Sequence, residues 1–582
     1  MYTTSAALPP IEERWNDKMK VVIVGGVAGG ATAAARIRRL DEQAEIVVFE
    51  RSGYISYANC GLPYYIGDVI TDPEELTLQT PESFFSRFRV QMKVHHEVTA
   101  IHPERKTVSV KNLESGEVFE EHYDKLILSP GAKPTQPRLG GVELENIFTL
   151  RTVEDTFAIK EYINAHHPKS VVLAGGGFIA LELAENLREL GMDVTIVQRP
   201  KQLMNPFDSD MAAFIHAEMR RHGVRLMLGH TVEGFEARDG GVDVLLKDEA
   251  PLHSDMVVLA IGVTPDTALA KEAGLELGLK GSIVVNDRME TSIPDIYAAG
   301  DAVQVRHSVT GQDVLLSLAG PANKQGRIIA DNICGGDSRY RGSQGSSVIK
   351  VFNMTAAATG INETNARKAG LDVESVILSP MSHAGYYPGG KVMTMKVVFE
   401  KGTYRLLGAQ IVGYEGVDKR IDVLATAIHA GLKATELQEL DLAYAPPFSS
   451  AKDPVNMAGF MIDNIAKGVV KQWHLEDVAT LPRDGSVTLL DTRTAGEFRH
   501  GYIEGFTNIP VDELRERLGE IEKGKVVYVI CQSGLRSYIA SRILMGNGYD
   551  VYNFAGGFRF YDAVMNDRAL IEQATACGMD RT

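Results

Sequence analysis

Two of the four cysteines lie in sequence contexts that suit sulfur chemistry. Cys60 lies in the stretch "SYANCGLP" (56–63), without the second cysteine about two to five residues away that thiol redox sites usually carry. Cys531 opens "CQSGLRS", where an apolar strand leads into a loop and then a helix. The successive N–H groups of that loop and the charge of Arg536 can hold an anion and stabilise a thiolate or a persulfide. The sequence therefore predicts one sulfur-binding loop and one lone reactive cysteine.

The segment before Cys60 has the pattern of a nucleotide-binding unit. Residues 20–40, "KVVIVGGVAGGATAAARIRRL", consist of an apolar strand, a glycine turn and a helix. Glu50 ends the next strand, 20 residues past Gly30, where a carboxylate can bind a ribose diol. The alternative is a tight strand-to-helix turn with a solvated Glu50. The loop supplies four candidate cofactor-binding residues, with a valine in place of the second glycine of GxGxxG: Gly25, Val27, Ala28 and Gly30.

A second unit of the same pattern follows 150 residues later. The stretch "SVVLAGGGFIALELAENLREL" (170–190) fits GxGxxA fully, with Gly175, Gly177 and Ala180 as candidate cofactor-binding residues. Its next strand ends in Gln198-Arg199 rather than in an acid. An acid there would repel the 2′-phosphate of NADPH, whereas Gln198 does not and Arg199 can attract it. The sequence leaves the choice between NADH and NADPH open.

The rest of the chain indicates two further units. After about residue 345 the apolar residues alternate with period two, as in antiparallel strands, and helical segments follow at 417–432 and 454–469. In the last part of the chain, strands such as "KVVYVICQS" alternate with helices. We expect an α/β protein with two Rossmann-like dinucleotide-binding domains, an α+β domain and a C-terminal α/β domain.

Paired dinucleotide units, the stretch "TSIPDIYAAGDAV" (291–303) and an α+β tail resemble the two-dinucleotide-binding flavoprotein disulfide reductases over residues 20–465. The stretch "SYANCGLPYYIG" is similar to the single-cysteine branch, which includes coenzyme A-disulfide reductases, NADH oxidases and peroxidases, and persulfide reductases. The resemblance implies FAD, with Asp301 beside its ribityl chain and phosphate, and NAD(P)H, with NADH slightly preferred. It implies that Cys60 lies against the flavin. Its thiolate, with a lowered pKa, then forms a mixed disulfide or persulfide whose second sulfur comes from the ligand.

Within that branch, the resemblance favours disulfide over peroxide chemistry. Peroxidases and oxidases carry a histidine in the first glycine loop, where this chain has Ala28. Coenzyme A-disulfide reductases supply two tyrosines from the partner subunit, and Tyr386 and Tyr444 match those places. This implies a homodimer whose phenols can protonate a leaving thiolate. Tyr387 is adjacent to Tyr386, and the sequence leaves open which of the two faces the site.

The family's coenzyme A contacts map onto the first helix and onto the residues just before Cys60. Arg36 and Arg39 are three residues apart, share a helix face and could grip phosphate groups. The alternative is an ordinary solvated basic face, since "RIRRL" also holds Arg38. The resemblance implies five substrate-binding residues: Thr32, Arg36, Arg39, Ser56 and Asn59.

Residues 479–567 resemble a single-domain rhodanese, which carries sulfane sulfur on a cysteine. The stretch "LLDTRTAGEFRHGYIEGFTNIP" matches the opening pattern of that family, and Cys531 and Arg536 match its active-site loop. The alternative is a related phosphatase, whose loop is one residue longer. Four residues separate Cys531 from Arg536 here, and this smaller ring suits sulfur.

The resemblances divide the chain into seven parts. We expect a disordered extension (1–19), an FAD-binding domain (20–130 and 255–335), an NAD(P)H-binding domain (131–254), a dimerisation domain (340–465), a linker (466–478), the rhodanese domain (479–567) and a tail (568–582).

Composition narrows the class of partner and the compartment. The chain has 582 residues and a net charge of −16, which disfavours nucleic acid and anionic membranes. No apolar run approaches the ~20 residues that span a bilayer, and the polar N-terminal stretch lacks a signal-peptide core. The cysteines are too widely spaced for a disulfide scaffold or a metal site, so we expect no metal and a reducing cytoplasm. We interpret Cys334 and Cys577 as structural or incidental.

The fusion of a reductase with a rhodanese narrows the expected substrate. We expect an enzyme that uses NAD(P)H to reduce coenzyme A persulfide, polysulfides or related persulfides, releasing hydrogen sulfide and thiol. One alternative is plain coenzyme A-disulfide reduction for thiol homeostasis. Another is a sulfur-relay protein that hands the Cys531 persulfide to a biosynthetic partner.

Overall fold

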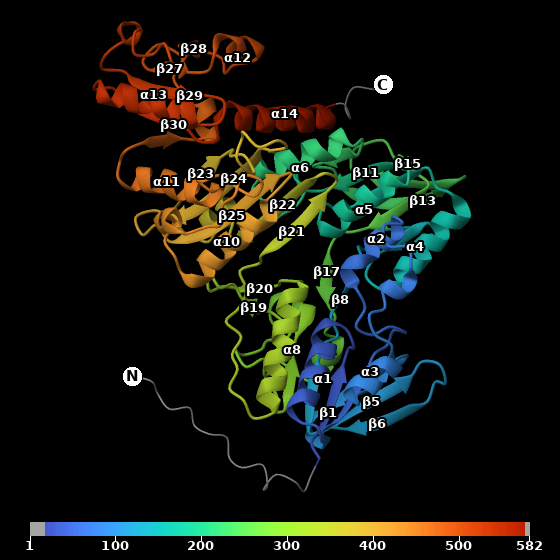
Figure 1. The fold of residues 1–582 in the computed structure, drawn as a ribbon. Coiled ribbons are helices and arrows are strands. Elements are labelled where there is room, and N and C mark those ends of the chain that lie inside the picture. Colours follow the sequence, from blue (N-terminus) through green and yellow to red (C-terminus); the bar gives the residue numbers. More distant parts are fainter. Residues whose placement is uncertain (1–17, 577–582) are drawn as a thin grey trace, which may run out of the picture.

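The computed structural model describes residues 18–576, and its first unit is a five-stranded parallel sheet. The central strands are almost wholly Val, Ile and Leu, as a sheet covered on both faces requires. Helices α1 (Ala28–Leu40) and α8 (Ala319–Ile333) pack together on one face (Figure 1). The strand order is β18 (Ile296–Ala298), β7 (Lys125–Leu128), β1 (Lys20–Val24), β2 (Glu45–Phe49), β3 (Gln91–Lys93). Most of the expected N-terminal extension and Cys577 lie outside the described residues.

The second unit is another five-stranded parallel sheet. Strand β16, which we expected to open the return to the first unit at residue 255, pairs instead with β10 inside this sheet. The chain returns only afterwards, through β17 (Val263–Pro265), which pairs antiparallel with β8 (Ala132–Pro134). The strand order is β12 (Arg225–Leu228), β11 (Asp193–Gln198), β10 (Ser170–Ala174), β16 (Met256–Leu259), β9 (Ile147–Thr149). The main helices are α4 (Val153–His166), α5 (Phe178–Glu189) and α6 (Ser209–Arg221).

A short helical segment ties the two units together. The turn η2 (Asn59–Gly61) carries Cys60 and leads into α2 (Leu62–Ile66), which packs against α4 and α5 of the second unit. Leu62 and Ile66 belong to the hydrophobic core of that unit. Cys60 therefore lies where the two units meet. The remaining helices and strands of these units are α3 (Pro81–Phe88), α7 (Ala268–Glu272) and the antiparallel strands β4 (His96–His102), β5 (Thr107–Asn112), β6 (Val118–His122), β13 (Val232–Arg238), β14 (Gly241–Leu246), β15 (Leu252–Ser254), β19 (Val305–Arg306) and β20 (Asp313–Val314).

The third unit is a five-stranded antiparallel sheet. Buried Lys396 joins it to the second unit through Asp208 (3.2 Å) and Asp210 (2.8 Å), and it also pairs with Glu363 (2.9 Å) of its own unit. Burial alone would lower the pKa of Lys396, but these carboxylates more than offset it and raise that pKa. The strand order is β21 (Ser347–Val351), β22 (Met354–Gly360), β25 (Leu406–Gly413), β24 (Met393–Glu400), β23 (Val373–Leu378), and the helices are α9 (Glu363–Lys368), α10 (Val417–Ala430) and α11 (Pro454–Ala466).

The fourth unit is a parallel sheet flanked by helices. Part of the expected linker is strand β26 of this sheet, because its buried Trp473 packs on Phe554 of β30. Part of the expected tail continues the last helix to residue 576. The strand order is β26 (Lys471–Trp473), β30 (Asp550–Phe554), β29 (Val526–Ile530), β27 (Thr488–Asp491), β28 (Thr507–Asn508), and the helices are α12 (Ala495–His500), α13 (Leu535–Gly546) and α14 (Gly557–Ala576).

The fourth unit rests on the second through α14 and α6 (Figure 1). Asp567 of α14 accepts hydrogen bonds from His216 (2.8 Å) and from Arg220 (2.5 Å) of α6. The other ring nitrogen of His216 accepts the N–H of Leu203 at 3.0 Å, so the Nδ1 of His216 carries the proton given to Asp567. This buried, charged contact fixes the fourth unit on the reductase part. Among residues 18–576, no helix has both the length and the apolar character needed to cross a membrane.

Candidate functional site

The first glycine loop is shaped for close approach of a ligand backbone. Gly25 has φ +96°, and a Cβ on it would collide with the carbonyl oxygen of Ser129 on the neighbouring strand end. A Cβ on Gly30 would collide with the carbonyl of Gly25, which explains how closely α1 begins above the sheet. Val27 is the N-cap of α1 and has no side-chain hydrogen bond there, and Ala28 begins the helix. The first N–H groups of α1 are therefore available to a pyrophosphate.

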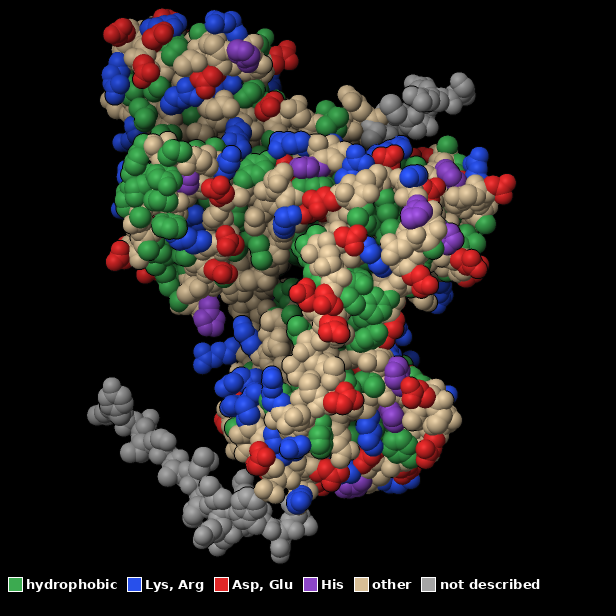
Figure 2. Space-filling view, turned by 45° about the vertical axis from the view of Figure 1, so that its right-hand side comes forward, with side chains coloured by type: hydrophobic (Ala, Val, Ile, Leu, Met, Phe, Trp, Pro, Cys, Tyr) green, Lys and Arg blue, Asp and Glu red, His purple; other side chains and the backbone are tan. Residues whose placement is uncertain are grey.

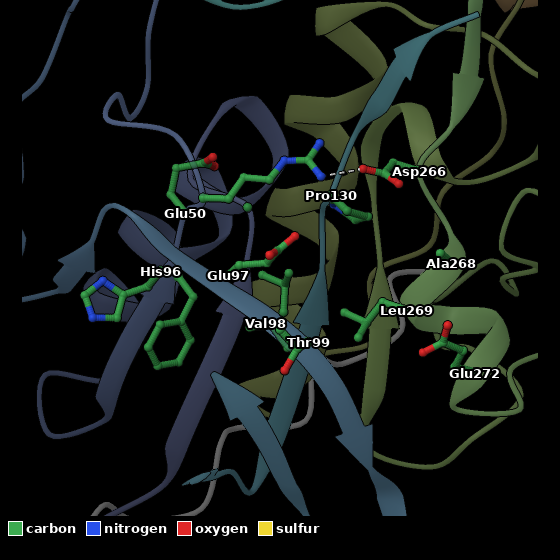
Figure 3. Close-up of a pocket in the computed structure, with 14 residues that line it drawn as sticks. Glu50, His96, Glu97, Val98, Thr99, Pro130, Asp266, Ala268, Leu269 and Glu272 are labelled. Atoms are coloured by element: carbon green, nitrogen blue, oxygen red, sulfur yellow. Dashed lines mark ion pairs between the residues drawn. The ribbon is translucent and has the colours of Figure 1, made fainter. Parts of the chain in front are cut away.

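A cavity of about 280 Å³ lies at the end of this sheet and is lined by Glu50 (Figure 3). The Glu50 carboxylate is buried and accepts the N–H groups of Gly26 (2.8 Å) and Ser52 (2.9 Å). The next residue, Arg51, pairs with Asp266 at 2.8 Å, the ion pair drawn in Figure 3. A second cavity of about 940 Å³ shares Glu50 and Arg51 with the first and continues to Cys60. The two hollows together form an elongated site that fits a dinucleotide such as FAD.

Cys60 lines the larger cavity together with Asp301. Asp301, in the turn that follows β18, pairs with Arg151 at 2.6 Å. The Cys60 side chain is exposed to this cavity, and among the described residues no hydrogen bond to its sulfur is found. Desolvation by the surrounding protein raises the pKa of the Cys60 thiol, Glu182 raises it further, and Arg151 opposes both. The residues of one subunit therefore do not give the Cys60 thiol the lowered pKa that we expected.

Two charged residues near Cys60 escaped the sequence analysis. Arg151 follows β9 and reaches the cavity from the second unit. Glu182 lies on α5, two residues beyond Ala180 of the second glycine loop, and burial raises its pKa to about 7. An acid so close to a glycine loop could have been noticed in the sequence. Arg151 has no local motif, because only the fold brings it to Asp301.

Of the five residues predicted to contact coenzyme A, two line the same cavity and three lie on α1. Ser56 and Asn59 line it directly. The Thr32 hydroxyl donates to Asn323 of α8 at 2.5 Å. Arg36 is paired with Asp331 of α8 at 2.8 Å, so its charge is already compensated, whereas Arg39 is exposed.

Helix α8 adds basic residues beside these contacts. Arg327 lies one turn from Asn323 and one turn from Asp331, between the two contacts that join α8 to α1. Arg327 and Lys324 are exposed, and neither forms an ion pair within residues 18–576. Figure 2 shows Lys and Arg side chains gathered at the left edge of the lower unit, the side on which Figure 1 places α8.

The second glycine loop repeats the geometry of the first. Gly175 has φ +122°, and a Cβ on it would collide with the carbonyl of Ala260. Gly177 caps α5 with open space around it, and Ala180 is fully buried under the helix. Gln198 ends β11, and its side chain lies against Gly176. The sheet edge formed by these residues can receive a second nucleotide.

Tyr386 and Tyr444 lie together, although neither lines the cavity of its own subunit. Their hydroxyl oxygens are 2.7 Å apart, and both side chains are exposed. The hydrogen bond to Tyr386 raises the pKa of Tyr444. Tyr387 instead packs edge-on against the ring of His383. Tyr387 is exposed as well, and the hydroxyl contact makes Tyr386 the one that pairs with Tyr444.

Cys531 lies in a closed cradle at the start of α13. Its side chain is 1 % exposed, and its sulfur accepts hydrogen bonds from the N–H of Gly534 (3.1 Å) and the hydroxyl of Ser537 (3.2 Å). Arg536 makes two 2.7 Å bonds to Glu497 of α12. This pairing lowers the pKa of Glu497 to about 2 and holds the loop against α12. Two donors aimed at one sulfur suit an anionic thiolate or persulfide.

Two parallel nucleotide-binding sheets with a lone thiol at their junction define an oxidoreductase of the two-dinucleotide type. Residues 19–326 match the pyridine nucleotide-disulphide oxidoreductase family, and residues 346–454 match its dimerisation domain. The chain belongs to this family, which depends on FAD and NAD(P)H, and it is a flavoprotein oxidoreductase. Residues 474–563 match the rhodanese-like domain. The predicted family, fold class and cofactors are confirmed.

The chain is similar to several characterised relatives. It is 38% identical to the coenzyme A disulfide reductase of Staphylococcus aureus (strain JH9) over 442 residues, 76% of this chain and 99% of that protein. The crystal structure of reduced Bacillus anthracis CoADR-RHD is 47% identical, with a TM-score of 0.93 over 96% of this chain and 100% of that one. An NAD-dependent persulfide reductase from A. fulgidus is 38% identical, with a TM-score of 0.87 over 93% of this chain and 100% of that one. The predicted relationship to these two kinds of reductase is confirmed.

Proposed function

We propose that this enzyme uses NAD(P)H to reduce coenzyme A persulfide and related persulfides to thiol and hydrogen sulfide. The observation that carries the proposal is the presence, in one chain, of a lone thiol in a large cavity and a second thiol in a persulfide-type cradle. The net reaction is R–S–SH + NAD(P)H + H⁺ → R–SH + H₂S + NAD(P)⁺. The similarity to a coenzyme A disulfide reductase and to a persulfide reductase supports this substrate class.

Cys60 is the proposed nucleophile of the reductase site. Its thiolate attacks the inner sulfur of R–S–SH, the one bonded to R. The S–S bond breaks, hydrosulfide leaves, and Cys60 becomes joined to the R–S group in a mixed disulfide. When bound, FAD would supply the two electrons, taken from NAD(P)H, that break the S–S bond of the mixed disulfide, so that R–SH leaves and Cys60 returns to the thiolate. Gly25, Val27, Ala28, Gly30, Glu50 and Asp301 would hold this cofactor. Arg151 holds Asp301 in place and places one positive charge near Cys60.

Tyr386 and Tyr444 are the proposed proton donors, acting from the partner subunit of a homodimer. Support comes from their exposure, their 2.7 Å contact and their distance from the cavity of their own chain. A pair of phenols that share a hydrogen bond can present one proton outward to a leaving thiolate. The dimerisation domain match supports the assembly. We propose the cytoplasm as its compartment, because both free thiols need a reducing medium.

The phosphate groups of coenzyme A would lie along α1 and α8. Ser56, Asn59 and Thr32 would contact the arm that leads to Cys60. Arg39, Arg327 and Lys324 are better placed for phosphates than Arg36, because Asp331 already compensates Arg36.

Cys531 would load sulfane sulfur and present it to an acceptor thiol. Gly534 and Ser537 donate to its sulfur, and Arg536 together with Glu497 fixes the loop. Because α14 is held on α6 by Asp567, we propose that a diffusing thiol such as coenzyme A carries the sulfur between the two sites.

The decisive experiment follows sulfide release and NAD(P)H oxidation under anaerobic conditions with coenzyme A persulfide. We expect one sulfide per NAD(P)H in the wild type and at least about a 1000-fold loss in Cys60→Ser with flavin content unchanged. Cys334→Ser is the matched control and should stay within about twofold of the wild type. A higher kcat/KM for coenzyme A disulfide than for the persulfide would favour thiol homeostasis instead. Turnover only with an added protein acceptor, in a stable complex, would favour a sulfur relay.

A further inference from the structure

We infer that the second nucleotide unit is built to receive the 2′-phosphate of NADPH, with Arg199 and Lys201 as its cationic partners. This deepens the proposed function, on which it rests, by naming the nucleotide. It reverses the slight preference for NADH that the sequence alone suggested. The argument compares the two glycine-loop units of the same chain.

The position that selects the ribose is acidic in the first unit and neutral in the second. Glu50 and Gln198 both end the strand that follows the glycine-loop helix, and both lie against the second residue of their loop, Gly26 and Gly176. Glu50 accepts the N–H of Gly26 and presents a carboxylate, which suits a ribose diol. Gln198 cannot repel a phosphate. Its amide makes only a long contact, 3.5 Å, to the carbonyl of Gln202.

The next residue is an arginine in both units, but its charge is compensated in only one. Arg51 pairs with Asp266 at 2.8 Å (Figure 3). Arg199 is exposed, and within residues 18–576 it forms no ion pair and no side-chain hydrogen bond. An exposed guanidinium beside the adenosine ribose position can bind a phosphate with two parallel hydrogen bonds. The first unit therefore pairs its exposed arginine with a carboxylate, and the second leaves its arginine unpaired for a ligand.

The neighbouring strand end adds a second cation to this edge. Strand β12 ends beside β11, and the N–H groups of Gly229 and His230 donate to the carbonyl of Gln198. The aliphatic part of the exposed Lys201 side chain lies against Gly229. In the described part of the chain, Lys201 also has no ion pair.

A carboxylate, that of Glu249, also lies at this edge. It is hydrogen-bonded to His230 at 2.5 Å. Two uncompensated cations and an amide therefore face the position of the 2′ substituent. In a chain with a net charge of −16, such a local patch is what an anion needs to bind.

The test measures binding of the two half-nucleotides to the purified holoenzyme by calorimetry, without any sulfur substrate. We expect 2′,5′-ADP to bind at least about tenfold more tightly than 5′-AMP. Arg199→Ala should remove most of this difference and change 5′-AMP binding by less than about twofold. Gln198→Glu should also reduce this difference, because the new carboxylate would repel the 2′-phosphate. Arg225→Ala, which removes an exposed cation from the other end of strand β12, is the matched control and should behave as the wild type.

Anaerobic reduction of the bound flavin gives the second readout. NADPH should reduce it with a kcat/KM about tenfold above that of NADH in the wild type, and Arg199→Ala should reverse the order. Equal binding of 2′,5′-ADP and 5′-AMP by the wild type would overturn the inference, as would equal losses in Arg199→Ala and Arg225→Ala. Neither readout involves persulfide, so failure of the proposed sulfur chemistry would leave this result unaffected.

Discussion

Cys60 and Cys531 are both free thiols, yet the chain surrounds them in opposite ways. Cys531 is 1 % exposed and receives two hydrogen bonds from its own loop and helix. Cys60 is exposed in a cavity of about 940 Å³, and the groups around it raise its pKa. Both donors to Cys531 lie within seven consecutive residues, whereas the Cys60 site is assembled from several segments.

The difference indicates how each sulfur gains its reactivity. Both donors to Cys531 come from its own loop and helix, so they can stabilise a persulfide on Cys531 until an acceptor thiol binds. Cys60 has one nearby cation, Arg151, and an opposing carboxylate, Glu182. In the proposed dimer, its thiolate would therefore depend on groups from outside its own chain, such as the cofactor, the substrate and the partner's tyrosines. The proposal thereby links reactivity at Cys60 to assembly and ligand binding.

The comparison predicts a division of substrates. We expect Cys531→Ser to lower sulfide release from polysulfide or thiosulfate about tenfold and to leave coenzyme A persulfide within about twofold, because only the bulk donors need loading. The measurement is kcat/KM for each donor in the same preparation. Mass spectrometry should show one added sulfur atom on the wild type and none on the variant. Equal losses with all donors would contradict separate roles for the two thiols.

A smaller effect is expected from one hydrogen bond of the cradle. Ser537→Ala removes the 3.2 Å hydroxyl donor and leaves the N–H of Gly534 in place. A hydrogen bond of this kind is worth roughly 1 kcal/mol, so alkylation of Cys531 at neutral pH should slow about fivefold. The rate is followed by iodoacetamide labelling and peptide mass spectrometry. Ser533→Ala, in the same loop but without a bond to this sulfur, is the control. A rate unchanged in Ser537→Ala would mean that the backbone alone forms the cradle.

The same contrast explains what the sequence could predict. The Cys531 loop is local, so its strand, turn, helix and charged residue could all be assigned from consecutive residues. The glycine loops were predictable for the same reason, since Gly25 and Gly175 need their positive φ in any such turn. The surroundings of Cys60 were not, because Arg151 carries no local motif and only the fold brings it and Glu182 from another unit to Cys60.

The boundaries between units also could not be predicted from the sequence alone. Strands β16 and β26 are short, and only their partners, β10 and β30, decide to which sheet they belong. The sequence alone also does not predict whether an arginine is free or paired with a carboxylate. Arg36 and Arg39 have equal standing in the sequence, and Asp331, nearly 300 residues away, distinguishes them.

The smallest expected effect concerns the carboxylate that opposes ionisation of Cys60. Burial raises the pKa of Glu182 to about 7, and its negative form raises the pKa of the Cys60 thiol. Below about pH 6, Glu182 is neutral, so the rate of alkylation of Cys60 should be the same in Glu182→Gln and in its parent. Above about pH 8, the carboxylate is charged, and the variant should react about twofold faster because its thiolate is no longer repelled. The comparison uses reduced holoenzyme in a Cys531→Ser background, with Glu189→Gln on the same helix as the control. Parallel pH profiles for Glu182→Gln and its parent would show that the thiol at the junction does not sense this charge.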